Sequence, residues 1–317
     1  MSVPALSVTE TSVLPVTDVL AWVVVAAFLG GMVAEWQGRR GLARTALAGA
    51  WGLFAVFWLL LIQYYAFIHR SIVETVLVAV AVPACLYVGW LLYQGRDSLF
   101  VLSRAVAFMG LIYLPFETSV IARTFLIETV ARQTAVVINW LGLADGMVLV
   151  EDPAADSMLL NTFWFPEAGR GSSIVFACTG IGSMAIFGGL ITAVKAPLRR
   201  KAVGLVISIS IIWVLNIARN AFIAVANGYQ WFAHPALRGP VMTAFGLTDP
   251  ARVSFFVADR IISQFLALFA LVAIAWLVSR WLPELLDIAE ELLYLLTGNE
   301  VRLRPPNAAP DGGEPQE

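Results

Sequence analysis

Residues 202–226 read AVGLVISISIIWVLNIARNAFIAVA, an apolar run in which Arg219 is the one ionisable side chain. A transmembrane helix needs about 20 predominantly apolar residues, and this run is long enough. Similar runs occupy residues 18–36, 42–65, 72–93, 99–116, 173–194 and 254–279. We therefore predict an all-α fold, a polytopic bundle of about seven membrane-spanning helices.

The composition supports the same conclusion. Hydrophobic residues make up 60% and charged residues 13% of the 317 residues, and the net charge is −2. A soluble domain rarely has so few charges, so the bilayer is expected to be the main solvent. Without a basic patch, a nucleic-acid partner is excluded. The two cysteines, Cys85 and Cys178, lack the spacing of a zinc site or a disulfide framework, and we expect no metal and no cofactor.

The segment 119–142 is the uncertain part of this topology. It carries Arg123, Glu128 and Arg132 at near-helical spacing beside an apolar face. We predict an amphipathic helix that lies in the membrane interface. If this segment crossed the membrane instead, the bundle would have eight spans.

The distribution of basic residues predicts the orientation. They gather in the loops after the first, third and fifth spans: Arg39, Arg40, Arg44, Arg96, Arg104, Lys195, Arg199, Arg200 and Lys201. The positive-inside rule makes these loops cytoplasmic, so the N-terminus is outside and the C-terminus inside. Residues 1–297 form the predicted transmembrane domain, and the polar, proline-rich residues 298–317 a disordered cytoplasmic tail.

Three reactive side chains share one depth in this topology. An arginine at the centre of a span costs about 2.5–3.5 kcal/mol, so Arg219 and Arg260 are candidate functional residues. Both lie about two turns from the outer end of their spans, and Cys178 has a similar depth in the span 173–194. We predict that these three spans enclose a polar cleft near the outer leaflet.

The helix faces fit this cleft, because each span carries its small or polar residues on one side. The three sets are Asn216, Arg219, Asn220 and Asn227; Arg260, Ser263, Gln264 and Ala267; and Cys178, Gly182, Ala185 and Gly189.

A thiol next to two cations suggests nucleophilic catalysis. Nearby cations and a helix N-terminus favour the thiolate, which is the reactive form of cysteine. We predict Cys178 as the nucleophile, Arg219 as the group that stabilises the thiolate and supplies a proton, and Arg260 as the stabiliser of the oxyanion. Neither arginine can serve as a general base, because its pKa exceeds about 12.

Other interpretations remain open on these residues alone. Cys178 could be a small buried residue, as we expect for Cys85, and either arginine could be a structural partner of Asp259. Ser183 could be the nucleophile of an intramembrane serine protease, but His69 and His234 both lie in loops. A non-enzymatic transporter or channel could use the same cleft. It predicts polar residues through the inner halves of these spans, and these halves are almost wholly apolar.

Three motifs resemble the exosortase/archaeosortase superfamily of membrane cysteine transpeptidases, and its archaeal branch in particular. They are ACTGIGSMAIF at 177–187, NIARNAFIA at 216–224 and ADRIISQ at 258–264, within a catalytic part of about 171–270. The third catalytic position falls on Arg260, with Arg252 as its rival.

The resemblance implies an enzyme of the cell membrane whose active site faces outside. It implies cleavage of secreted proteins near a C-terminal Pro-Gly-Phe motif, through an acyl thioester on Cys178, and transfer to a membrane lipid. The implied substrates, such as S-layer glycoproteins, carry the motif, a transmembrane helix and a basic tail.

Overall fold

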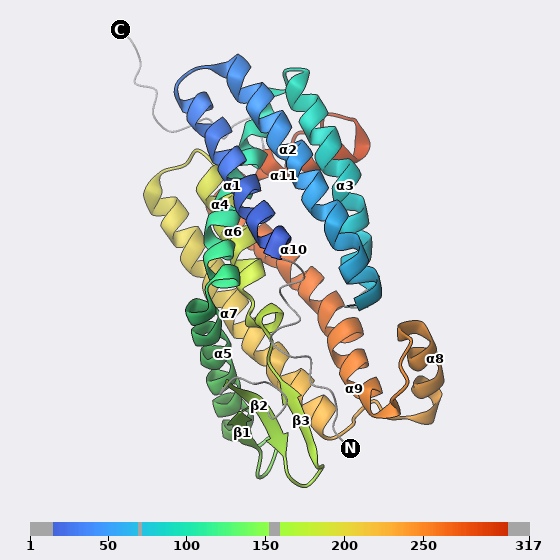
Figure 1. The fold of residues 1–317 in the computed structure, drawn as a ribbon. Coiled ribbons are helices and arrows are strands. Elements are labelled where there is room, and N and C mark those ends of the chain that lie inside the picture. The colour runs from blue at the N-terminus through green and yellow to red at the C-terminus, as the bar shows by residue number, and fades with distance from the viewer. Residues whose placement is uncertain (1–14, 69–71, 152–158, 304–317) are drawn as a thin grey trace.

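The computed structural model describes residues 15–68, 72–151 and 159–303, and most of them are helical (Figure 1). Within these described residues, six helical stretches are long and apolar enough to cross a membrane: Thr17–Trp36, Arg40–Phe67, Glu74–Tyr93, Asp97–Thr118, Leu198–Gly228 and Pro250–Trp281. A shorter apolar helix, Ile181–Ala193, is the counterpart of the predicted fifth span. The predicted polytopic helical membrane protein is therefore confirmed.

The N-terminal half forms one bundle. Helices α1 (Pro15–Trp36), α2 (Arg40–Gln63), α3 (Ile72–Tyr93) and α4 (Phe100–Thr118) enclose a core that includes Phe28, Leu47 and Leu92. The Trp51 indole donates a hydrogen bond of 2.9 Å to Ser103 Oγ, which satisfies both polar groups inside this core. At the ends of the helices away from the sheet, Arg104 of α4 pairs with Glu35 of α1 at 2.7 Å.

The predicted fifth span is wrong in its extent. A helix was expected over 173–194, but α6 covers only Ile181–Ala193. Before it lie the strand β3 (Arg170–Ser173) and the 3₁₀ turn η4 (Phe176–Thr179). The apolar side chains of Ile174 and Phe176 made this stretch look like a span, but they are buried in the protein core.

A small antiparallel sheet, which the sequence did not suggest, lies beside the lower end of α7 (Figure 1). Its strands are β1 (Val148–Glu151), β2 (Leu160–Phe165) and β3, in the order β1-β2-β3. Thr162 of β2 pairs with Ser173 of β3. Phe163 and Phe165 belong to the same core as residues of α5 and α7, so the sheet holds the chain just before Cys178 in place.

The segment 119–142 does form a helix, α5 (Val120–Trp140), which Ser119 caps. One face of α5 is buried in the core, while Ile121, Phe125, Val136 and Trp140 are exposed on the surface. Both sides of the helix are therefore apolar. Its position in the membrane interface stays a prediction.

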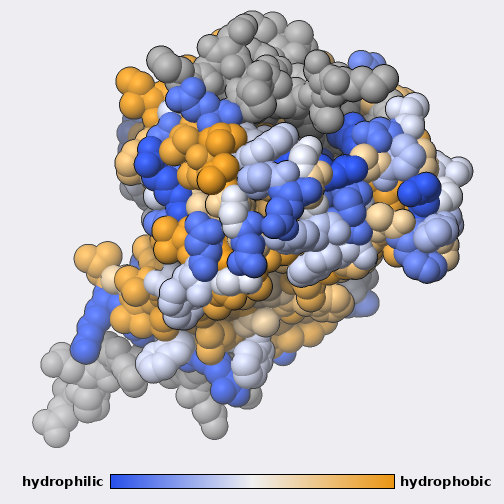
Figure 2. All heavy atoms as spheres, turned by 90° about the horizontal axis from the view of Figure 1, so that it is seen from below, coloured by the Kyte–Doolittle hydropathy of each residue, from blue (hydrophilic) through white to orange (hydrophobic). Residues whose placement is uncertain are grey.

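Helix α7 (Leu198–Gly228) has 31 residues and is about 46 Å long, which exceeds the hydrocarbon thickness of about 30 Å. The remaining elements are α8 (Pro235–Phe245), the 3₁₀ turn η5 (Pro250–Arg252), α9 (Val253–Phe256), the π-helix η6 (Val257–Ser263), α10 (Gln264–Trp281) and α11 (Leu285–Thr297). Viewed from below, the end with the sheet carries a broad hydrophilic area beside hydrophobic patches (Figure 2).

Candidate active site

Cys178 lies in the turn η4, two residues before the left-handed Gly180 that precedes α6. Its carbonyl oxygen accepts hydrogen bonds from the amides of Asn216 and Asn220, both at 2.9 Å. Both asparagines are buried on α7. Gly180 has a φ of +79°, and a Cβ there would lie 3.0 Å from Cγ of Asn216. The turn that carries the thiol is therefore fixed against α7 by two hydrogen bonds and a close approach that requires glycine.

Arg219 lies on α7 between these two asparagines. Its Nη2 donates a 2.6 Å hydrogen bond to Oδ1 of Asp259 in η6. The Asp259 side chain is only 8% exposed. The Nε of Arg219 is buried and has no hydrogen-bond partner in the described structure. One buried N–H of this guanidinium is thus left without an acceptor in the resting site.

Arg260 is held from two directions. Its Nε lies 3.3 Å from Oδ2 of Asp259, and its Nη1 lies 3.5 Å from Oε2 of Glu74 at the start of α3. The Arg260 side chain is 10% exposed. Both Asp259 and Arg260 belong to a π-helix, a rare form that is frequent at functional sites.

The charges of Arg219, Asp259 and Arg260 all act on the Cys178 thiol, which lies outside the membrane-spanning helices. Burial raises the pKa of this thiol above its ordinary value and has the largest effect. Arg219 and Arg260 lower the pKa, and Asp259 raises it. We expected a lowered thiol pKa, but the pKa is raised in the resting site, because burial outweighs the charges of the two arginines and Asp259 adds to its effect.

The structure brings Cys178, Arg219 and Arg260 together, and that they catalyse stays a prediction. The rival Arg252 is exposed and lies over the ring of Phe256, with its guanidinium carbon 5.3 Å from the ring centre. It is not among the charges found to act on the Cys178 thiol.

The other reactive candidates lie elsewhere. The His234 Nδ1 accepts a hydrogen bond from the Ala236 amide at the start of α8, so His234 serves as a helix cap. His69 lies outside the described residues. Cys85 is buried in the core of the N-terminal bundle, as expected for a packing residue.

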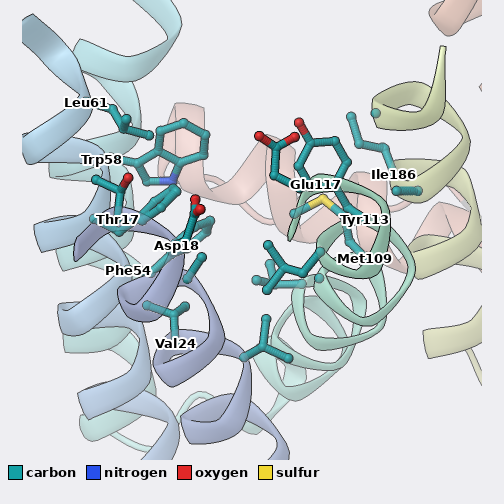
Figure 3. Close-up of a pocket in the computed structure, with 18 of the residues that line it drawn as sticks. Thr17, Asp18, Val24, Phe54, Trp58, Leu61, Met109, Tyr113, Glu117 and Ile186 are labelled. Carbon is teal, nitrogen blue, oxygen red and sulfur yellow. The ribbon is translucent and has the colours of Figure 1, made fainter. Parts of the chain in front are cut away.

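A cavity of about 490 Å³ lies on the α4 side of α6 (Figure 3). In Figure 3, Asp18 and Trp58 lie on one wall and Tyr113, Glu117 and Ile186 on the other. The lining comes from α1 to α4, α6 and the π-helix η2 (Tyr64–Ile68), but not from α7 or α10. We expected a cleft between the fifth, sixth and seventh spans. The cavity lies on another side of the site, because the polar residues of α7 and η6 contact η4 and each other instead.

Two lining residues connect this cavity to the site. Glu74 is an ion-pair partner of Arg260, and Gly182 follows Cys178 by four residues. Glu74 was missed in the sequence, although a carboxylate at the edge of a predicted span is a signal of the kind that identified Arg219. Asp259 was noted only as a structural partner of an arginine.

Fold and site together define a multi-pass helical membrane protein with a partly buried cluster of one thiol, two guanidinium groups and one carboxylate. The family model described as transmembrane exosortase matches residues 17–248. The chain belongs to this family and is a membrane transpeptidase within it. The matched region includes Cys178 and Arg219 and ends before Asp259 and Arg260.

Two relatives extend the similarity beyond that region. The chain is 65% identical to archaeosortase A of Natronomonas pharaonis, over 95% of each chain. It is 49% identical to archaeosortase A of Haloferax volcanii, over 91% of this chain and 96% of the relative. The predicted resemblance to archaeosortase A is therefore confirmed, and it favours an enzyme over a transporter or channel. No solved structure matches the chain.

Proposed function

We propose that this protein is a cysteine transpeptidase that cleaves secreted proteins near a C-terminal Pro-Gly-Phe motif and transfers them to a membrane lipid. The observation that carries the proposal is the cluster around Cys178. The backbone carbonyl of Cys178 accepts two hydrogen bonds from α7, and the charges of Arg219 and Arg260 act on the thiol of the same residue. Arginines within membrane spans are costly, so two of them beside a thiol indicate a functional site.

In the first step, the Cys178 thiol passes its proton to a water molecule beside Arg219, and the sulfur attacks the carbonyl carbon of the scissile peptide bond. Negative charge then develops on the carbonyl oxygen, where the guanidinium of Arg260 stabilises it. The C–N bond breaks, and the leaving amine takes up a proton from Arg219 or from a water molecule that Arg219 holds. The products are an acyl thioester on Cys178 and the released C-terminal segment.

In the second step, a nucleophile on a membrane lipid attacks the thioester carbonyl carbon. The C–S bond breaks, and the Cys178 sulfur takes up the proton that the lipid nucleophile loses. Lipid access is supported by the cavity beside α6, whose wall is mostly apolar and whose volume of about 490 Å³ falls in the range of small-molecule sites. Gly182, which lies at the start of α6 and four residues after Cys178, lines this cavity.

The predicted orientation supports the choice of substrate. A secreted protein with a C-terminal transmembrane helix and a basic cytoplasmic tail presents its motif at the outer face of the cell membrane. S-layer glycoproteins have this form. The basic loops of this chain predict the same outer side for Cys178.

The test is a secreted reporter with the motif, an apolar helix and a basic tail, in cells whose own enzyme is deleted. Cys178→Ala should abolish both cleavage and lipid attachment, because the variant has no nucleophile. Cys85→Ala and Ser183→Ala should process the reporter like the wild type. Normal processing by Cys178→Ala would refute the proposal, and loss of processing only in Ser183→Ala would indicate serine chemistry.

A further inference from the structure

We propose that Asp259 is a positioning residue that holds Arg219 and Arg260 in a fixed arrangement beside Cys178. The inference rests on the proposed function. It adds a fourth residue to the three that were predicted to be catalytic. Asp259 reaches the reaction only through the two arginines, so its role differs from theirs.

The geometry of the carboxylate carries the inference. Each oxygen of Asp259 serves a different guanidinium: Oδ1 accepts from Nη2 of Arg219 at 2.6 Å, and Oδ2 lies 3.3 Å from Nε of Arg260. Arg219 comes from α7, whereas Asp259 and Arg260 come from η6. A single buried carboxylate therefore sets the distance and the angle between the two cations.

The π-helix makes this arrangement possible. Asp259 and Arg260 are adjacent in sequence, and adjacent residues of an α-helix do not face each other. In the wider turn of η6 their side chains form an ion pair, while Asp259 still reaches α7. Ala258 is fully buried and packs with Ile223 and Ala226 of α7, which brings η6 and α7 into close contact at this level.

The charges of this cluster balance. Arg219 and Arg260 contribute two positive charges, and Asp259 and Glu74 contribute two negative charges. Removing the charge of Asp259 leaves one positive charge in excess next to the thiol. The variant should therefore make Cys178 easier to ionise and at the same time make the two arginines less well oriented for catalysis.

These opposite effects separate positioning from a structural role. A variant that only loosens the fold lowers turnover and has no reason to shift the ionisation of Cys178 in a defined direction. A positioning residue predicts lower turnover together with a thiolate that forms at lower pH. The alkylation rate of Cys178 reports this ionisation and needs no substrate.

Other charges near Cys178 are held constant in the test. Burial and the three charges of Arg219, Asp259 and Arg260 act on the thiol. On the α5 side, Arg123 lies over the ring of Phe176, at 5.4 Å from its centre, and pairs with Glu117 of α4. Helix α6 contributes no ionisable side chain, since Ile181–Ala193 contains none.

The experiment uses the purified full-length chain with Cys85→Ala, which leaves Cys178 as the single thiol. Alkylation by iodoacetamide, an uncharged reagent, is measured as a function of pH, and reporter processing is measured in parallel. For Asp259→Asn we expect processing to fall about tenfold or more and the alkylation midpoint to move to lower pH. Asp259→Glu keeps the charge, so its midpoint should stay close to the wild-type value and its processing should exceed that of Asp259→Asn.

Glu35→Gln is the matched control, because it breaks another largely buried ion pair, with Arg104, far from Cys178. It should change neither the midpoint nor processing. Wild-type processing by Asp259→Asn would overturn the inference, and so would reduced processing with an unmoved midpoint. If Asp259→Asn does not fold, Asp259→Glu carries the test. An alkylation midpoint clearly below the wild-type value in Asp259→Glu would then overturn the inference. Failure of the proposed function is distinct: the parent protein would then process no reporter, while the alkylation comparison would still be measurable.

Discussion

Gly180 is the residue on which the position of Cys178 depends most directly. Its φ of +79° and the 3.0 Å from a Cβ to Asn216 Cγ exclude a side chain without rearrangement. We expect Gly180→Ala to cost about 1–2 kcal/mol of stability from backbone strain alone, and to lower turnover because the turn moves away from α7.

Gly146→Ala serves as the control for this strain. Gly146 has a φ of +70°, and no atom lies within 4 Å of a Cβ there. It should lose a similar amount of stability in thermal unfolding and keep its turnover. If both variants process the reporter equally well, the anchoring of η4 on α7 is not required.

The two asparagines on α7 make a second prediction at this scale. Because both donate to the same Cys178 carbonyl, Asn216→Ala or Asn220→Ala alone leaves it one donor. The double variant leaves the carbonyl without a donor from α7, which should lower stability by an additional amount of about 1–3 kcal/mol. A double-mutant cycle on stability and turnover should therefore show a loss greater than the sum of the single losses. Strict additivity would contradict a shared role.

The sequence identified some of these residues and missed others for a physical reason. Cys178, Arg219 and Arg260 stand out because reactive or charged groups are costly in apolar segments. Asp259 was named as a possible partner of either arginine, but its contact with both at once depends on the π-helix, which no local pattern revealed. Glu74 approaches Arg260 from a helix 186 positions away in the chain, and one sequence cannot show such a contact.

At the scale of elements, the packing of α6 on α4 depends on Gly189. A Cβ at Gly189 would lie 2.5 Å from the Ala105 carbonyl oxygen and 2.8 Å from the Met109 nitrogen, both backbone atoms. Gly189, which we expected to face the cleft between the last three spans, instead lets the backbone of α4 approach α6 closely. Gly189→Ala should force the helices apart and lower stability by about 1–3 kcal/mol, the usual cost of overpacking.

The adjacent Gly188 provides the control. A Cβ there would lie 2.6 Å from Cδ1 of Ile112, the end of a flexible side chain that can change rotamer. Gly188→Ala should therefore cost much less in the thermal unfolding of the detergent-solubilised protein. An equal loss in both variants would show that backbone contact between α4 and α6 does not limit the packing.

Element boundaries were predictable only where hydrophobicity alone determines them. Helices α1 to α4 agree closely with the predicted spans, because a membrane helix requires a long apolar run. The sheet was missed because its strands are short and β3 is polar, with Arg170, Ser172 and Ser173. The turn over Pro166–Gly169, where Gly169 has a φ of +60°, was a hairpin signal that we did not use.

At the scale of the whole molecule, the predicted orientation can be tested by labelling. Glu167, in the turn between β2 and β3, and Asn299, after α11, are both exposed. In a background without Cys85 and Cys178, Glu167→Cys should react with a membrane-impermeant maleimide in intact cells, because that turn is predicted to lie outside. Asn299→Cys should react only after permeabilisation. The reverse pattern would invert the topology and place the site on the cytoplasmic side.

The thioester on Cys178 is the central claim, and it can be observed directly. The purified protein is incubated with a peptide that carries the Pro-Gly-Phe motif. The reaction is quenched in acid, and the mass of the intact protein is measured by mass spectrometry. We expect a mass increase equal to the N-terminal fragment of the cleaved peptide less one water, absent from Cys178→Ala and removed by hydroxylamine. Peptide cleavage without an adduct that hydroxylamine removes, or an equal adduct on Cys178→Ala, would contradict a thiol nucleophile at this site.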